Sequence, residues 1–118
     1  MRTIVLAVGR TQPPYADDVQ HYQKLLARRI PERAYVCLLD SHGTAYGSEA
    51  FAAWLEERRQ AGRDVCFVIG GPRGVSLEQC DLKLSLGAMT LPHQLARVVL
   101  LEQLYRAHKI LAGQPYHY

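Results

Sequence analysis

Three short apolar runs alternate along the chain with segments whose apolar positions have helical spacing. The runs cover residues 3–8, 34–39 and 65–69, and each is rich in Val, Ile, Leu or Phe. Continuous apolar runs of this length are typical of strands that are buried on both faces of a parallel sheet. A fourth segment, residues 82–86, alternates apolar and polar positions, which predicts a shorter, half-buried strand.

Helices are predicted between these strands. Residues 15–30 repeat apolar positions at helical spacing, with acidic residues in the first turn and basic residues near the end, as the helix dipole favours. After a predicted loop over residues 41–47, Ser48 is the expected N-cap of a second helix. That helix is expected to end at Gly62.

The longest predicted helix covers about residues 92–112. Its apolar residues fall at nearly every angle around the helix axis, so it must be covered on more than one side. One side can be the sheet, and we expect the other to be a second copy of the chain. The sequence therefore predicts an α/β fold with a mostly parallel sheet, flanking helices and a homodimeric state.

The composition mainly excludes other classes of protein. The 118 residues are 48% apolar and 21% charged, which is ordinary for one globular domain over residues 1–118. No apolar run is long enough to span a membrane, and the first residues lack a signal-peptide pattern, so we expect a cytoplasmic protein without a membrane partner. Three cysteines without a C-x-x-C pair indicate no disulfide framework and no thiolate metal site, and Cys37 and Cys66 are expected core thiols.

The net charge of +3 comes entirely from the C-terminal third of the chain. Basic and acidic residues balance over residues 1–81, whereas residues 82–118 contain four basic residues and one acidic residue. This asymmetry suggests an anionic partner, most simply nucleic acid, although a solvated face would give the same count.

The ends of the predicted strands are the expected place for a ligand. The strands are followed by Gly9, Asp40, Gly70 and Gly87, and ligands of open α/β sheets bind outside the carboxyl ends of the strands. Residues 70–74 form a glycine-rich loop that matches neither G-x-G-x-x-G nor a P-loop. Its glycines permit close approach, either of a ligand or of another loop.

Four blocks of the chain strongly resemble the ribosomal RNA large subunit methyltransferase H family. They are FVIGGPRG at residues 67–74, LSLGAMTLPH at 84–93, EQLYRA at 102–107 and GQPYH at 113–117. The resemblance implies a SPOUT-class methyltransferase with a C-terminal trefoil knot, S-adenosylmethionine as methyl donor and a homodimer as the working unit. It also implies N3-methylation of a pseudouridine in the 23S rRNA of the large ribosomal subunit.

The sequence departs from the family pattern in two places. Residues 30–33 join the first helix to the second strand almost directly, where family members usually have a further strand and helix. Tyr118 stands where the family commonly has a basic residue. The chain therefore resembles a shortened member of the family. The features in question are the rRNA contacts of the extra unit and the phosphate contact of that basic residue.

The resemblance implies a cofactor site built from two strand ends and one loop. Its residues are Leu39, Gly71, Leu86, Gly87, Ala88, Met89, Thr90 and Leu91. Backbone groups of such loops can bind the edge of an adenine while apolar side chains enclose its faces. The alternative is that the leucines are simply part of the core.

The acceptor side is expected at the C-terminal tail. The N3 imide of a pseudouridine must lose a proton, and His117 and Tyr116 are the candidate catalytic residues by type. Tyr118 adds a second aromatic ring that can stack on a base. Arg73 is the favoured rRNA contact, and His93 either contacts the substrate or makes a structural hydrogen bond.

Two other functions compete with this prediction. One is a noncatalytic module that binds RNA or the ribosome, and the other is a small nucleotide-binding α/β domain of unrelated function. Arg73 is favoured over Arg106 as the RNA contact, because Arg106 stands four residues after Glu102 and is expected to pair with it.

Overall fold

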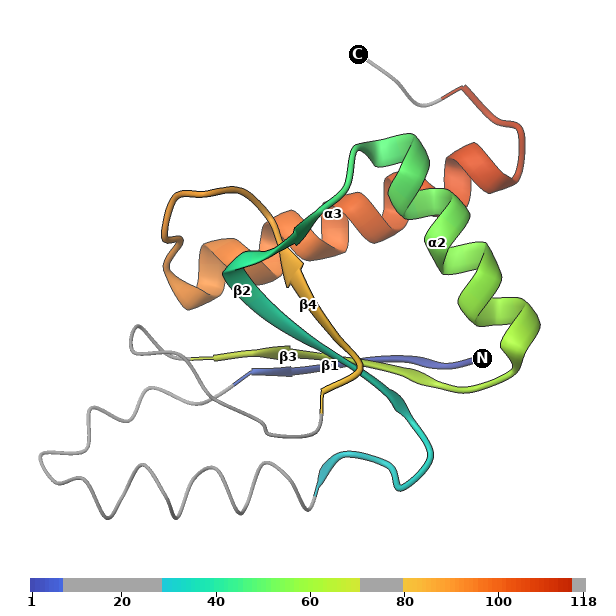
Figure 1. Ribbon diagram of the computed structural model, residues 1–118. Coiled ribbons are helices and arrows are strands. Elements are labelled where there is room, and N and C mark those ends of the chain that lie inside the picture. Colours follow the sequence, from blue (N-terminus) through green and yellow to red (C-terminus); the bar gives the residue numbers. More distant parts are fainter. Residues whose placement is uncertain (8–28, 71–79, 116–118) are drawn as a thin grey trace, which may run out of the picture.

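A computed structural model describes residues 1–7, 29–70 and 80–115, and within them four strands form one parallel sheet. The strands are β1 (Thr3–Ala7), β2 (Tyr35–Ala45), β3 (Val65–Ile69) and β4 (Leu82–Ser85). Their order across the sheet is β1-β3-β2-β4, so β1 and β4 form its edges (Figure 1). The predicted α/β fold with a parallel sheet is confirmed.

Two helices, α2 (Ser48–Ala61) and α3 (His93–Leu111), lie on the same face of the sheet (Figure 1). Helix α2 ends as predicted, because Gly62 adopts φ 79° and its N–H donates to the carbonyl of Arg59 at 3.1 Å. Helix α3 also has its predicted bounds to within one residue. The helix expected over residues 15–30 falls almost entirely outside the described residues.

The predicted cap of α2 is wrong by one position. Gly47 is the N-cap residue, and Ser48 is the first residue of the helix. The Ser48 hydroxyl donates to Gln103 Oε1 of α3 at 3.1 Å, so it is engaged between helices rather than with its own first turn.

The core has two parts, one on each face of the sheet. Successive residues of β3 point to opposite faces, so Phe67 packs against α2 and α3 while Cys66 and Val68 pack on the other face. Every residue of β3 is buried. On the helical side, the rings of Phe51 and Trp54 stack with their centroids 5.5 Å apart.

The two cysteines expected in the core are there. Cys37 and Cys66 are each 0% exposed. Burial in apolar surroundings disfavours a thiolate, which raises the pKa of Cys37 to about 12 and also raises the pKa of Cys66. These thiols therefore pack as small apolar side chains.

Strand β1 is less buried than its apolar sequence predicts. Ile4, Val5 and Leu6 are half-buried, and Thr3 and Ala7 are exposed. The reason is its place at the edge of the described sheet, next to β3 alone. A continuous apolar run does not distinguish an edge strand from a central one.

Strand β2 is longer than predicted, and it replaces most of the expected loop over residues 41–47. Leu39 and Thr44 both pair with Leu84 of β4, so residues 40–43 leave the ladder and return to it. Gly43 lies directly against the backbone of Lys83, where even a Cβ atom would overlap the Lys83 carbonyl. We call residues 40–43 the β2 excursion.

Within the described part of the chain, no helix is both long and apolar enough to cross a bilayer.

Candidate functional site

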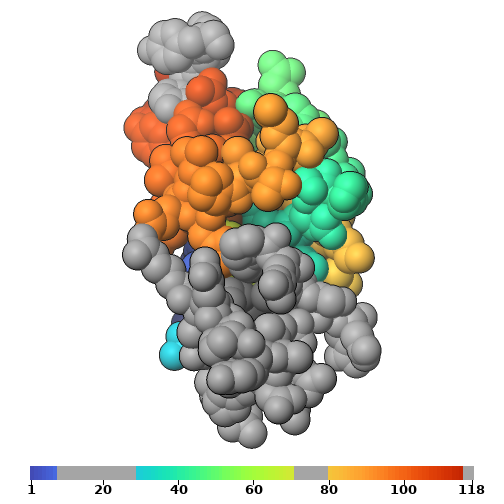
Figure 2. Space-filling view, turned by 90° about the vertical axis from the view of Figure 1, so that its left-hand side faces the viewer, coloured from blue at the N-terminus to red at the C-terminus, as the bar shows by residue number. Residues whose placement is uncertain are grey.

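The carboxyl ends of β2 and β4 bring together two of the segments to which the cofactor was assigned. Leu39 pairs with Leu84, and the loop of residues 86–91 begins directly after β4. Ser85 connects the two segments, because its hydroxyl lies 3.1 Å from the Ser41 carbonyl oxygen and 3.0 Å from the Gly87 carbonyl oxygen. Figure 2 shows the end of β2 in teal beside the loop and the start of α3 in orange, on one face of the molecule.

The predicted cofactor residues of this loop divide into two groups. Leu86 and Leu91 are half-buried and pack, together with Leu39, against the core under α2 and α3. The four residues between them are exposed: Gly87, Ala88, Met89 and Thr90. Met89 is 82% exposed, so within this structure it encloses no pocket.

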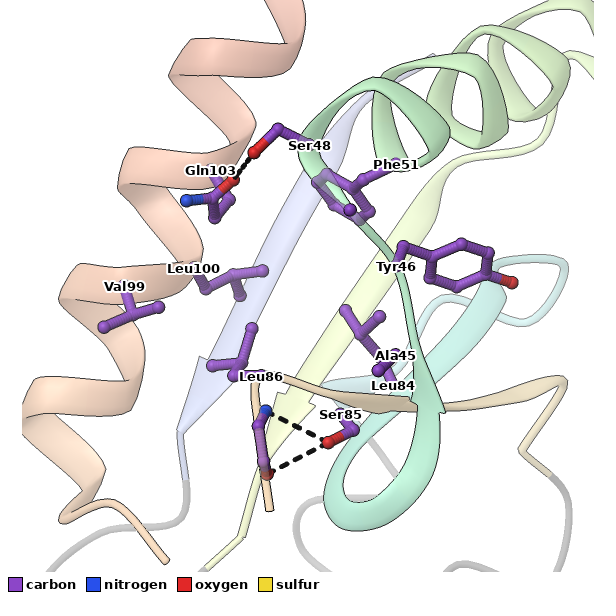
Figure 3. Close-up of a pocket in the computed structure, with 12 residues that line it drawn as sticks. Ala45, Tyr46, Ser48, Phe51, Leu84, Ser85, Leu86, Val99, Leu100 and Gln103 are labelled. Atoms are coloured by element: carbon purple, nitrogen blue, oxygen red, sulfur yellow. Dashed lines mark hydrogen bonds between the residues drawn. The ribbon is translucent and has the colours of Figure 1, made fainter. Parts of the chain in front are cut away.

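A cavity of about 260 Å³ opens beside the beginning of this loop, between α3, the start of α2 and the ends of β2 and β4 (Figure 3). Of the predicted cofactor residues, Leu86 and Gly87 line it. The other lining residues are Ala45, Tyr46, Gly47, Ser48, Phe51, Leu84, Ser85, Val99, Leu100 and Gln103. Small-molecule sites typically enclose about 300–1,000 Å³, so the volume of this cavity lies just below that range.

Gln103 is a polar lining residue that the sequence analysis did not single out. Its Oε1 accepts the Ser48 hydroxyl (Figure 3). Its Nε2 donates to Glu102 Oε2 at 2.9 Å. Arg106 pairs with Glu102 at 3.0 Å, as its spacing predicted. The signal for Gln103 was its place inside the EQLYRA block, but the pattern alone did not show which face of α3 it occupies.

His93 is the first residue of α3 and is half-buried. Its Nε2 is shielded from solvent and has no hydrogen-bond partner among the described residues. A buried polar atom without a partner costs about 1–3 kcal/mol. The two roles predicted for His93, a substrate contact and a structural hydrogen bond, both stay predictions.

Five predicted site residues lie outside the described residues. They are Gly71, Arg73, Tyr116, His117 and Tyr118. Their assignments stay predictions. The knot also stays a prediction, because residues 71–79, which connect β3 to β4 in the chain, are not among the described residues. Among the described residues, no group of three or more His, Cys, Asp or Glu side chains could hold a metal ion.

Comparison with known proteins shows the family to which the chain belongs. A family model described as "Predicted SPOUT methyltransferase" matches residues 19–117. The chain belongs to the SPOUT methyltransferase family. The match covers the described part of the sheet from β2 to β4, both described helices and the loop of residues 86–91.

Curated relatives of this SPOUT methyltransferase carry the name ribosomal RNA large subunit methyltransferase H. The protein of Nitratidesulfovibrio vulgaris (strain DP4) is 46% identical over 120 residues, which cover 98% of this chain and 76% of the relative. That of Rhodospirillum rubrum is 43% identical, covering 96% of this chain and 78% of the relative. That of Acidiphilium cryptum is 52% identical over 95 residues, covering 78% of this chain and 60% of the relative. The resemblance drawn from the four sequence blocks is therefore confirmed.

Proposed function

We propose that this SPOUT methyltransferase methylates ribosomal RNA, with S-adenosylmethionine as the methyl donor and N3 of a pseudouridine in the 23S rRNA as the acceptor. The observation that carries the proposal is that Leu39 pairs with β4 at Leu84 and that the next residue of β4, Ser85, joins Ser41 to the start of the loop of residues 86–91. Relatives named as rRNA large subunit methyltransferases support the choice of substrate. With this substrate, we expect the protein in the cytoplasm.

The residues at this edge fit a nucleoside cofactor. Leu39, Leu86 and Leu91 offer apolar surface beside the loop, and the backbone of the exposed residues 88–90 offers N–H and C=O groups to the edge of an adenine. Gly71 would complete this set. When bound, S-adenosylmethionine supplies a methyl group on a positively charged sulfur, which is already activated for transfer.

The task left to the chain is to hold the acceptor in line and to take its proton. Positioning of two reactants accounts for much of the rate of such transfers. We assign Tyr116 and His117 to the acceptor and proton transfer, and Arg73, His93 and Tyr118 to substrate binding. The unpartnered Nε2 of His93 supports its assignment, and the other four rest on residue type and family resemblance.

We further propose that the working unit is a homodimer formed through α3. On the face of α3 opposite its buried residues, Leu95, Val98, Leu101 and Tyr105 are each 46–61% exposed. An apolar stripe of this kind on a surface helix indicates a contact with another chain. A C-terminal trefoil knot is expected from the family.

Two measurements test the proposal. Isothermal titration calorimetry should show that the chain binds S-adenosylmethionine and does not bind NAD. Mass spectrometry of rRNA from a strain without the gene should show one missing methyl group on a 23S pseudouridine, which returns when the gene is restored. Binding of RNA without binding of S-adenosylmethionine would instead support the noncatalytic module.

A further inference from the structure

Ser85 is an unusual residue for the place it occupies. It is the last residue of β4 and only 7% exposed, and it is the one polar residue among the buried side chains of the described chain. A buried hydroxyl is costly unless it is hydrogen-bonded. Its partners therefore show what this position does.

The partners of the Ser85 hydroxyl come from two different segments. Its oxygen accepts the N–H of Gly87 at 3.0 Å, and its hydrogen can go to the carbonyl oxygen of Gly87 at 3.0 Å or of Ser41 at 3.1 Å. Figure 3 shows the two contacts with Gly87 as dashed lines from the labelled serine. A hydroxyl has a single hydrogen, so it serves the two carbonyls by sharing or by alternating.

Neither partner segment is held by the sheet at these points. Ser41 belongs to the β2 excursion, which leaves the ladder between Leu39 and Thr44. Gly87 has φ +141°, a conformation that side chains other than glycine rarely adopt. Backbone groups outside a ladder need other partners, and Ser85 supplies them to both segments.

We propose that Ser85 is a positioning residue for the cofactor. Its hydroxyl fixes the start of the loop of residues 86–91 against the β2 excursion, which holds that loop in register with Leu39. This inference rests on the proposed function, because it assumes that S-adenosylmethionine binds between these segments. Ser85 acts through the backbone of Gly87 and Ser41 and makes no contact with the methyl group.

Removal of the hydroxyl tests this role. In Ser85→Ala the Gly87 N–H and the Ser41 carbonyl lose their shared partner, so part of the binding free energy must go into ordering the loop. A net hydrogen bond is worth about 0.5–1.5 kcal/mol, which corresponds to about a two- to twelvefold weaker affinity. We expect this increase in both Kd and KM for S-adenosylmethionine, with kcat at saturating cofactor within about twofold of the wild type.

Two variants separate positioning from stability. Asp81→Ala removes a side-chain hydrogen bond at the opposite end of β4, where the Asp81 carboxylate accepts the Val36 N–H at 2.8 Å, away from the loop of residues 86–91. Asp81→Ala should also lower the free energy of unfolding, measured by urea denaturation, but without the rise in Kd expected for Ser85→Ala. Ser85→Thr keeps the hydroxyl and should restore the affinity.

A measurement without ligand completes the test. The Gly87 amide hydrogen, which is bonded to the Ser85 oxygen, should exchange with deuterium faster in Ser85→Ala than in the wild type or Asp81→Ala. Unchanged exchange, or an affinity that falls equally in both alanine variants, would overturn the role of Ser85. A wild-type chain that does not bind S-adenosylmethionine would refute the proposed function and this role together, whereas equal binding by wild type and Ser85→Ala refutes only the role.

Discussion

Single residues at the β2–β4 junction matter because backbone approaches backbone there. At Gly43 the nearest atoms to an added Cβ would be the carbonyl oxygen and carbon of Lys83 and the nitrogen of Leu84. All three are main-chain atoms in the sheet, so they cannot rotate away as the end of a flexible side chain could. The β2 excursion therefore depends on a glycine for steric reasons, since Gly43 does not have a positive φ.

Gly43→Ala should destabilise the protein by about 1–3 kcal/mol, the usual cost of overpacking. Gly47→Ala is the matched control, because a Cβ there meets nothing within 4 Å and the φ of −69° suits alanine. Urea denaturation of both variants measures the difference. Equal stability of the two variants would show that the close approach at Gly43 is absent in solution.

The three cysteines should differ in reactivity toward iodoacetamide in the folded protein. Cys37 and Cys66 are fully buried, and their pKa values are raised by burial, so neither exposes a thiolate at pH 8. Cys80 is half-buried. Mass spectrometry of the native protein should find carbamidomethylation first at Cys80, and all three sites should react in urea. Early modification of Cys37 would contradict the burial of β2.

The sequence predicts some residues of this junction and not others. The positions of Leu39 and Leu86 follow from strand periodicity and from the rule that parallel strands end at one edge. The role of Ser85 does not, because its partner is the backbone carbonyl of a residue 44 positions earlier. The residues Asp40, Ser41, His42 and Gly43 have the composition of a loop, and only pairing with β4 makes the following residues part of a strand.

At the scale of elements, one acidic residue adds to the ladder that joins the edge strand β1 to β3. Asp64, just before β3, accepts the Arg2 backbone N–H at 2.8 Å and the Arg2 Nε at 3.1 Å. The Arg2 carbonyl in turn accepts the Val65 N–H at 2.9 Å. The hydrogen bond from the Arg2 backbone, followed by that from its side chain, lowers the pKa of the Asp64 carboxyl.

This lowered pKa predicts an acid-sensitive contribution to stability. In the unfolded chain the Asp64 carboxyl binds protons at its ordinary pKa of 3.8, above its value in the folded protein. Its contribution is therefore present above pH 3.8 and is lost as the pH falls from there through the folded-state pKa. The difference in unfolding free energy between wild type and Asp64→Asn should be largest near pH 6 and shrink toward pH 3. Denaturant titrations at several pH values measure it, and a constant difference would contradict the ion pair.

At the scale of the whole molecule, the proposed dimer rests on the exposed apolar stripe of α3, which consists of Leu95, Val98, Leu101 and Tyr105. Val98, at 61% exposed, is the most exposed residue of this stripe. Leu111 is on the same helix and 40% exposed, but it lies on another side of the helix.

Val98→Lys should shift the protein from dimer to monomer, because a desolvated charge in a contact between copies is costly. Leu111→Lys should leave the dimer intact. Sedimentation equilibrium at micromolar concentration compares the two variants with the wild type. A wild type that is monomeric, or two variants that both remain dimeric, would refute dimerisation through this stripe.

The order of strands also determines how such a chain must fold. Every strand pair described is parallel, and the paired residues are far apart in sequence, as with Thr3 and Val65, Tyr35 and Val65, and Cys37 and Leu82. No pair can form by closing a short hairpin. The chain therefore loses the conformational entropy of a long loop before any sheet contact compensates for that loss. Chains dominated by such distant contacts fold more slowly than helical proteins of similar length. Until the last strand is in place, this chain exposes unpaired apolar strands, which can aggregate. The yield of refolded protein should therefore fall as the protein concentration rises.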